Sequence, residues 1–161
     1  MATVEDAIAA AVLDLFQLPD WEPRLPIHRL YVAPDFVKWG DETAVLHDKK
    51  FSIGGRTLFE HLLQTLCDFR CMERFHCGDL RRLMPTSKGI WSMHAPGLRI
   101  YGWCPKQHEF VAVTGATEID TKTDKTLNGK KRKHVEQFIY QHGLSQTILR
   151  GDILAIFPHK N

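Results

Sequence analysis

Apolar residues recur at helical spacing in several stretches of the chain. Residues 3–18 carry one such stripe and begin at Thr3, a residue type that caps helices. Residues 56–74 form the longest run, and residues 131–142 form another. The spacing predicts a helix over each of these segments, and Pro-Asp in front of Phe36 predicts a short helix over Asp35–Trp39. The inward positions expected in the last long helix are Val135, Phe138 and Ile139.

Other stretches alternate between apolar and polar residues, which is the period of a β-strand. Residues 27–33 predict one strand, and residues 89–118 predict an antiparallel meander of three strands. Its turns fall at 95–97 and 105–108, where Pro and Gly or Pro and Lys occur. The run Asp152–Phe157 predicts a final strand. Helices that precede a run of strands indicate an α+β fold.

The remaining segments are expected to connect these elements. Residues 79–85 are interpreted as a connector and Asn128-Gly129 as a turn. Three prolines between 19 and 26 indicate an extended linker. The chain is therefore expected to have an N-terminal helix and linker over 1–26, followed by one α+β domain over 27–161.

The predicted meander has two unlike faces, because successive side chains of a strand point to opposite sides. One face is apolar and suits a core. The other is basic, aromatic and polar, with no carboxylate, and is expected to be open. Such a surface suits a polyanion with exposed bases, RNA above all. The apolar face comprises Trp91, Met93, Leu98, Ile100, Val111 and Val113, and the polar face comprises Ser92, His94, Arg99, Tyr101 and Trp103.

Charge is divided unevenly along the chain. Residues 1–79 hold 13 acidic and 8 basic side chains, whereas residues 80–161 hold 6 acidic and 13 basic ones. The basic half contains a dense stretch over 122–134 with a single acid, Asp124. Clustered positive charge favours phosphate binding, although a solvated basic surface without a ligand is the simpler alternative. The expected phosphate contacts are Lys122, Lys125, Lys130, Lys131, Arg132 and Lys133.

Bulk composition and cysteine usage narrow the class of protein. In 161 residues, 43% are hydrophobic, which is enough for a core. No apolar run reaches the length of a membrane span, so we expect a cytoplasmic protein without a membrane partner. Four cysteines lack the spacing of a common zinc motif; free thiols are favoured over a site shared with His61 and His76. We expect no metal and no other cofactor. The cysteines are Cys67, Cys71, Cys77 and Cys104.

Four sequence segments together resemble a known family. The connector DLRRLMP leads into strands that read GIWSMHA, LRIYGW and FVAVTGA. This combination is similar to the RelE/ParE superfamily of bacterial toxins, nearest the HigB-like and phage-derived branch. The resemblance spans roughly residues 27–142. It implies a RelE-like fold, with the N-terminal helix and the C-terminal strand as additions.

The resemblance also implies a function. It implies a ribosome-dependent endoribonuclease that cuts mRNA and that a cognate antitoxin neutralises. Basic residues on the sheet activate the 2′-hydroxyl, and an aromatic side chain stacks on a base. Arg99 and His94 match basic positions of that pattern, and Ser92 matches a position that is often basic. The pattern places a Lys or Arg just after Gly115, where this chain has Ala-Thr-Glu-Ile-Asp.

The chemistry of the residues themselves also suggests roles for His94 and Arg99. Cleavage through the 2′-hydroxyl requires a base for that hydroxyl, a cation for the phosphate and an acid for the leaving 5′-oxygen, but no metal. His94 has a suitable pKa range for the base, and a turn over 95–98 would set it opposite Arg99, about 5 Å away. The alternative is that His94 is an ordinary surface histidine beside a turn. Tyr101 and Trp103 are candidate platforms for bases, although aromatic residues in strands are often simply core.

A second function remains open. The acidic residues after Gly115 favour a RelE-like protein that has no catalytic activity. Such a protein would bind nucleic acid, or the nucleic-acid groove of a host defence complex, as an inhibitor of the anti-CRISPR type.

Overall fold

The structure is a computed structural model that describes residues 2–71, 79–152 and 156–157. Its centre is a six-stranded mixed sheet in the order β1-β2-β6-β5-β4-β3. Strands β3 to β6 form antiparallel pairs, which confirms the predicted meander, but β2 and β6 are parallel. The strands are β1 (Asp14–Leu15), β2 (Arg29–Val32), β3 (Leu80–Arg82), β4 (Ile90–Ala95), β5 (Leu98–Trp103) and β6 (Glu109–Thr117).

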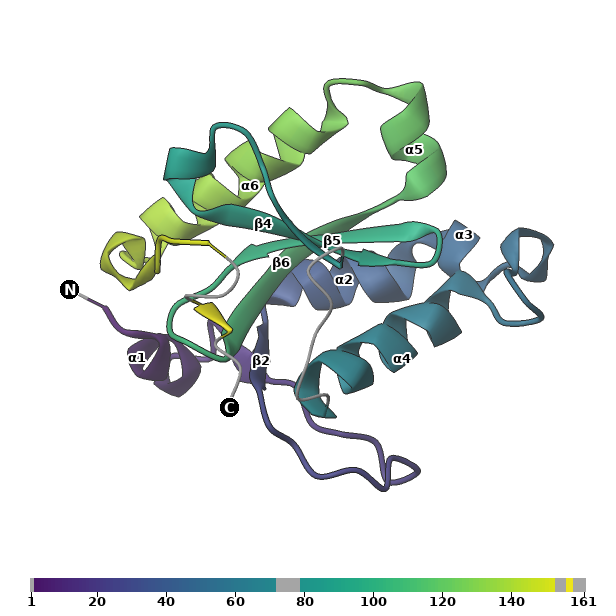
Figure 1. Ribbon diagram of the computed structural model, residues 1–161, viewed down its shortest axis with the longest axis horizontal. Helices are drawn as coiled ribbons and strands as arrows, with labels where there is room; N and C mark the ends of the chain where they lie inside the picture. Colours follow the sequence, from purple (N-terminus) through teal and green to yellow (C-terminus); the bar gives the residue numbers. More distant parts are fainter. Residues whose placement is uncertain (1, 72–78, 153–155, 158–161) are drawn as a thin grey trace.

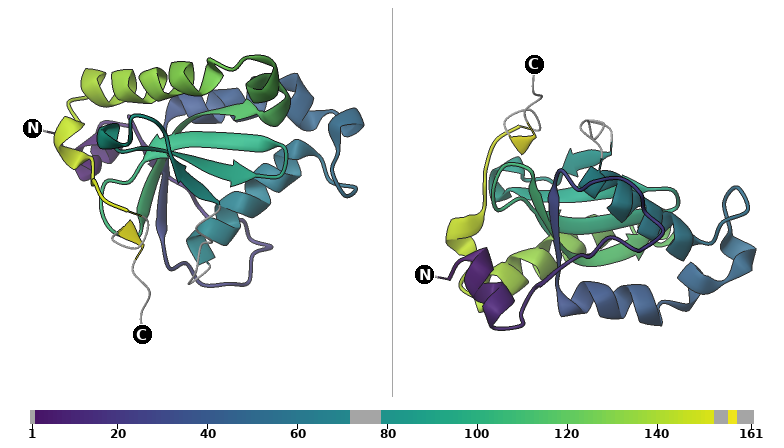
Figure 2. Two further views of the ribbon diagram at one scale, coloured as in Figure 1. Left: turned by 45° about the horizontal axis from the view of Figure 1, so that its top comes forward. Right: turned by 90° about the horizontal axis from the view of Figure 1, so that it is seen from below.

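Helices cover both faces of this sheet (Figures 1 and 2). In the left view of Figure 2, α6 lies above the sheet and α4 below it. The expectation of an α+β fold is therefore confirmed. No described helix is long and apolar enough to cross a membrane. The helices are α1 (Val4–Ala9), α2 (Pro34–Glu42), α3 (Ala44–His47), α4 (Leu58–Cys71), α5 (Glu118–Thr123) and α6 (Leu127–Gln141), with 3-10 turns at Lys49–Phe51, Thr86–Lys88 and Ser145–Thr147.

One hydrophobic core lies between the sheet and α4. The helix contributes an apolar stripe at helical spacing, and the strands contribute the face that the alternation predicted. Four of the six predicted residues of that face lie in this core. The helix residues are Leu58, Leu62, Leu66 and Phe69, and the confirmed strand residues are Trp91, Met93, Leu98 and Ile100.

A second core fills the opposite face, under α6. Val135, Phe138 and Ile139 point inward as predicted and pack on β5 and β6. The assignment of Val111 and Val113 to the first face was wrong, because both belong to this second core. Trp103 pairs with Val111 and so shares its face, and the register between β5 and β6 shifts after Tyr101.

The N-terminal segment differs from the predicted helix over 3–18. A capping box between Thr3 and Asp6 starts α1, as the sequence suggested, but the helix ends at Ala9. Ala11 adopts a positive φ of 56°, and the chain turns into β1. Because β1 pairs with β2, the segment over 1–26 supplies an edge strand to the sheet.

Other segments of the chain also differ from expectation. Within the expected connector over 79–85, Leu80–Arg82 form edge strand β3. Residues after β6 form α5, and Asn128-Gly129 lie inside the first turn of α6 rather than in a turn. Of the expected strand Asp152–Phe157, residues 153–155 lie outside the described residues. Ile156 and Phe157 are buried in the core under α4.

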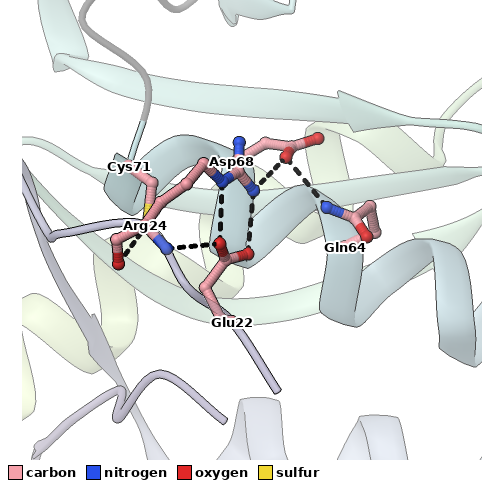
Figure 3. A network of polar contacts seen from close by, with 5 residues as sticks. All are labelled: Glu22, Arg24, Gln64, Asp68 and Cys71. Atoms are coloured by element: carbon pink, nitrogen blue, oxygen red, sulfur yellow. Dashed lines mark hydrogen bonds and ion pairs between the residues drawn. The ribbon is translucent and has the colours of Figure 1, made fainter. Parts of the chain in front are cut away.

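A polar network ties the linker before β2 to α4 (Figure 3). Arg24 donates to both carboxylate oxygens of Glu22, at 2.8 and 2.9 Å, and to Asp68 Oδ1 at 2.7 Å. Gln64 donates to the same Asp68 oxygen. The hydrogen bonds from Arg24 lower the pKa of Glu22 to about 2. One guanidinium thus connects a proline-rich segment to a helix 44 positions later in the chain.

Replacing Arg24 should loosen this attachment. We expect Arg24→Ala to lower the melting temperature at pH 7. The deficit should shrink as the pH falls from about 4.5 towards 2, because Glu22 becomes protonated and its contribution is lost there in the wild type too. Thermal melts across that pH range measure the effect. Lys106→Ala, which removes an exposed surface pair with Glu5, should change the melting temperature little, because solvent screens that pair. Equal effects of the two variants at every pH would contradict the prediction.

Candidate functional site

A polar cluster lies on the α6 face, at the end nearest the turn between β4 and β5. The register pairs Arg81 with Ser92, Ser92 with Tyr101, and His94 with Arg99. Directly paired residues of antiparallel strands point to the same face, so these side chains gather at one end. The predicted placement of His94 opposite Arg99 is confirmed. Arg81 is an addition that sequence reasoning missed, because β3 was not predicted.

The imidazole of His94 is half-buried within this cluster. Ser92 Oγ lies 3.0 Å from His94 Nε2. Burial, followed by the nearby charges of Arg99 and Arg81, lowers the pKa of His94 to about 4. The imidazole is therefore neutral at pH 7. When Nε2–H donates to Ser92, Nδ1 holds the lone pair that can accept a proton.

A carboxylate also belongs to the cluster. Glu118 is the first residue of α5, and its Oε1 lies 3.8 Å from Arg99 Nη2 and 3.0 Å from Lys122 Nζ. The hydrogen bond from Lys122 is the main cause of a lowered pKa at Glu118. Two of the predicted RNA contacts, Arg99 and Lys122, are therefore paired with one acid.

The aromatic part of the expected open face is buried. Tyr101 and Trp103 are 0% exposed, and Ser92 is 3% exposed. Tyr101 donates its hydroxyl to Asn128 Oδ1 at 2.6 Å, and Trp103 donates Nε1 to Thr147 Oγ1 at 3.1 Å. The expectation of an open face was wrong here, since α6 covers both rings. Neither ring can stack on a base in this arrangement.

The basic stretch over 122–134 is partly neutralised by its neighbours. Lys130 pairs with Asp124 at 2.9 Å, and Arg132 pairs with Glu136 at 3.0 Å. Lys125 and Lys133 are exposed and form no ion pair with any described residue. The stretch therefore presents fewer available cations than its composition suggests.

Lys131 occupies a different environment. Its Nζ donates to Thr114 Oγ1 at 3.3 Å, and burial lowers its pKa. It lines a hollow of about 440 Å³ that adjoins a second of about 500 Å³, and Trp39 and Thr43 line both. This groove was not predicted. Gly115 is a sequence signal that fits it, because a side chain there would lie 2.4 Å from the ring of Trp39.

The thiols give no sign of a metal centre in the part of the chain that is described. Cys67, Cys71 and Cys104 are buried and free, and burial raises the pKa of each thiol. Among residues 2–71, 79–152 and 156–157, no three His, Cys, Asp or Glu side chains are placed to hold a metal ion. Cys77 and His76 lie outside those residues.

No protein-family model, curated protein or solved structure matches this chain. Its function must therefore be inferred from its own residues and their arrangement.

The position of His94 predicts an unusual titration. We expect its imidazole to titrate near pH 4 rather than near 6.5, because burial disfavours the charged form and protonation adds a charge beside two arginines. Since the unfolded chain binds this proton more readily, His94 should reduce stability as the pH falls from about 6.5 to 4. NMR titration of the histidine resonances measures the midpoint, and His94→Gln assigns the signal. A midpoint near 6.5 would refute the burial of this side chain.

Proposed function

We propose that this protein is a cytoplasmic RNA-binding protein of the RelE-like type that cleaves mRNA through the 2′-hydroxyl, without a metal. The observation that carries this proposal is the pairing of His94 with Arg99 in one polar cluster. A neutral imidazole can accept a proton, and a guanidinium beside it can bind the phosphate being attacked. Ribosomal RNA and a cognate antitoxin protein are the partners that this function entails.

The reaction can be written with the residues present. His94 Nδ1 takes the 2′-hydroxyl proton as the 2′-oxygen bonds to phosphorus. Arg99 stabilises the charge that develops on the phosphate oxygens. The bond to the 5′-oxygen breaks and water supplies its proton, leaving a 2′,3′-cyclic phosphate and a 5′-hydroxyl. Burial is the main cause of the lowered pKa of His94, and the charges of Arg99 and Arg81 add to it. A bound phosphate offsets those two charges and so makes His94 a better base.

Lys131 supports this assignment from another element. The resemblance predicts a cation on the third strand of the meander, and the sequence after Gly115 lacks one. In the structure Lys131 reaches from α6 to Thr114 of β6, so a cation lies beside that strand from a different part of the chain.

Cleavage in a translating extract tests the proposal. We expect wild-type protein to cut mRNA and leave 2′,3′-cyclic phosphate ends. Arg99→Ala and His94→Gln should each reduce the rate by about 100-fold or more, the range for loss of a charge-stabilising or acid–base group. His134→Gln serves as the control, since this histidine pairs with Asp35 away from the cluster. If the wild-type protein leaves mRNA uncut, the proposal of a nuclease is wrong.

A non-catalytic inhibitor is the second candidate, and two observations favour it. Glu118 pairs with Arg99, and the buried rings of Tyr101 and Trp103 cannot hold a base in place. Such a protein would use its cations to occupy the nucleic-acid groove of a host defence nucleoprotein complex. Lys125 and Lys133 are available for that role, because both are exposed and neither pairs with an acid among the described residues.

Salt dependence tests the contribution of these lysines. Binding to single-stranded RNA should weaken as salt rises, by about 0.7 in the logarithmic slope for each phosphate contacted. We therefore expect the double variant Lys125→Ala/Lys133→Ala to flatten the slope by about 1.4. The pair Lys49→Ala/Lys50→Ala removes two exposed lysines from the acidic half and should leave the slope unchanged. Equal slopes for both double variants would show that Lys125 and Lys133 do not contact RNA.

A further inference from the structure

The carboxylate of Glu118 lies where an anionic ligand of the cluster would bind. Its Oε1 contacts Lys122 at 3.0 Å and Arg99 at 3.8 Å. It is also close enough to His94 for each group to influence the pKa of the other. A phosphate bound to Arg99 and His94 would lie close to this negative charge.

The backbone of Glu118 is fixed, whereas its side chain can move. The amide of Glu118 donates to Gly97 O at 2.8 Å, which attaches the start of α5 to the turn between β4 and β5. Thr117 caps the helix by accepting from Asp120 N at 3.2 Å. The side chain of Glu118 is 33% exposed, so it can turn towards solvent without disturbing this attachment.

The contact with Arg99 is also a weak one. Charge-assisted hydrogen bonds from a guanidinium measure about 2.7–2.9 Å, and Arg binds carboxylate and phosphate in the same two-pronged way. At 3.8 Å, the Glu118–Arg99 contact is an ion pair longer than such a hydrogen bond. A phosphate with better geometry can therefore replace the carboxylate at Arg99.

We propose that Glu118 is an internal stand-in for phosphate, which closes the Arg99 anion site until a phosphate of the RNA backbone displaces it. This inference rests on the proposed function and adds a means of regulation to the same site. An acid in the cluster is then compatible with phosphate binding, because Glu118 contacts Arg99 only while no phosphate is bound. Displacement also leaves Lys122, which is 73% exposed, available to the incoming phosphate.

The test compares binding of a single-stranded RNA and of inorganic phosphate to the wild type and four variants. Glu118→Gln should strengthen both by about twofold to fivefold, the range expected when one surface ion pair is removed. Glu5→Gln is the matched control, because it removes the same charge from another 3.0 Å pair with a lysine. It should change neither affinity. Arg99→Ala/Glu118→Gln should bind neither ligand more tightly than Arg99→Ala does, since the gain depends on the guanidinium.

Each outcome bears on one of the two proposals. If Glu118→Gln matches Glu5→Gln, or if its gain persists without Arg99, the stand-in role of Glu118 is wrong. Glu118→Ala repeats that arm with a second residue that favours helix, and circular dichroism confirms that α5 and α6 remain folded. If Arg99→Ala leaves RNA binding unchanged while the gain in phosphate binding holds, the RNA function fails and the role of Glu118 stands.

Discussion

The packing of α6 on the sheet is the constraint that decides where this protein can act. Sheet faces without such a cover are available to ligands, but here α4 fills one face and α6 fills most of the other. Strand β6 is buried along its whole length from Glu109 to Thr117. His94 and Arg99 lie at the end of the α6 face, beside the turn between β4 and β5, and both are partly exposed. The chemistry of the cluster thus follows from the length and position of one helix.

Local pattern predicted much of this fold, because strand alternation and helix periodicity are encoded within short segments. The register that sets His94 opposite Arg99 follows from the short turn at Pro96-Gly97, and it was predictable for that reason. The parallel pairing of β2 with β6 was not, since it joins residues about 80 positions apart and no local turn specifies it. The same applies to β3, whose three residues are too few to show a period.

The candidate site was predictable in its polar half and not in its aromatic half. The apolar stripe of α6 predicted that this helix packs against a hydrophobic core. No residue of the stripe specifies which face of the sheet the helix covers. Tyr101 and Trp103 suit a core as well as an exposed platform, because strands favour aromatic residues in both settings. Their hydrogen bonds to Asn128 and Thr147 come from segments beyond the meander. The burial of these rings is therefore a tertiary outcome that strand alternation could not reveal.

Charge behaves in the same way. The basic stretch over 122–134 suggested a row of phosphate contacts, yet helical spacing brings acids alongside several of its cations. Glu118 and Lys122, and likewise Arg132 and Glu136, lie four residues apart on one helix face. Lys131 projects onto β6 instead, where its ammonium group is partly buried. One stretch of sequence thus separates into paired, buried and exposed cations. Net charge identified the half of the chain that carries most of the cations, but only the geometry distinguishes the cations that a ligand could reach.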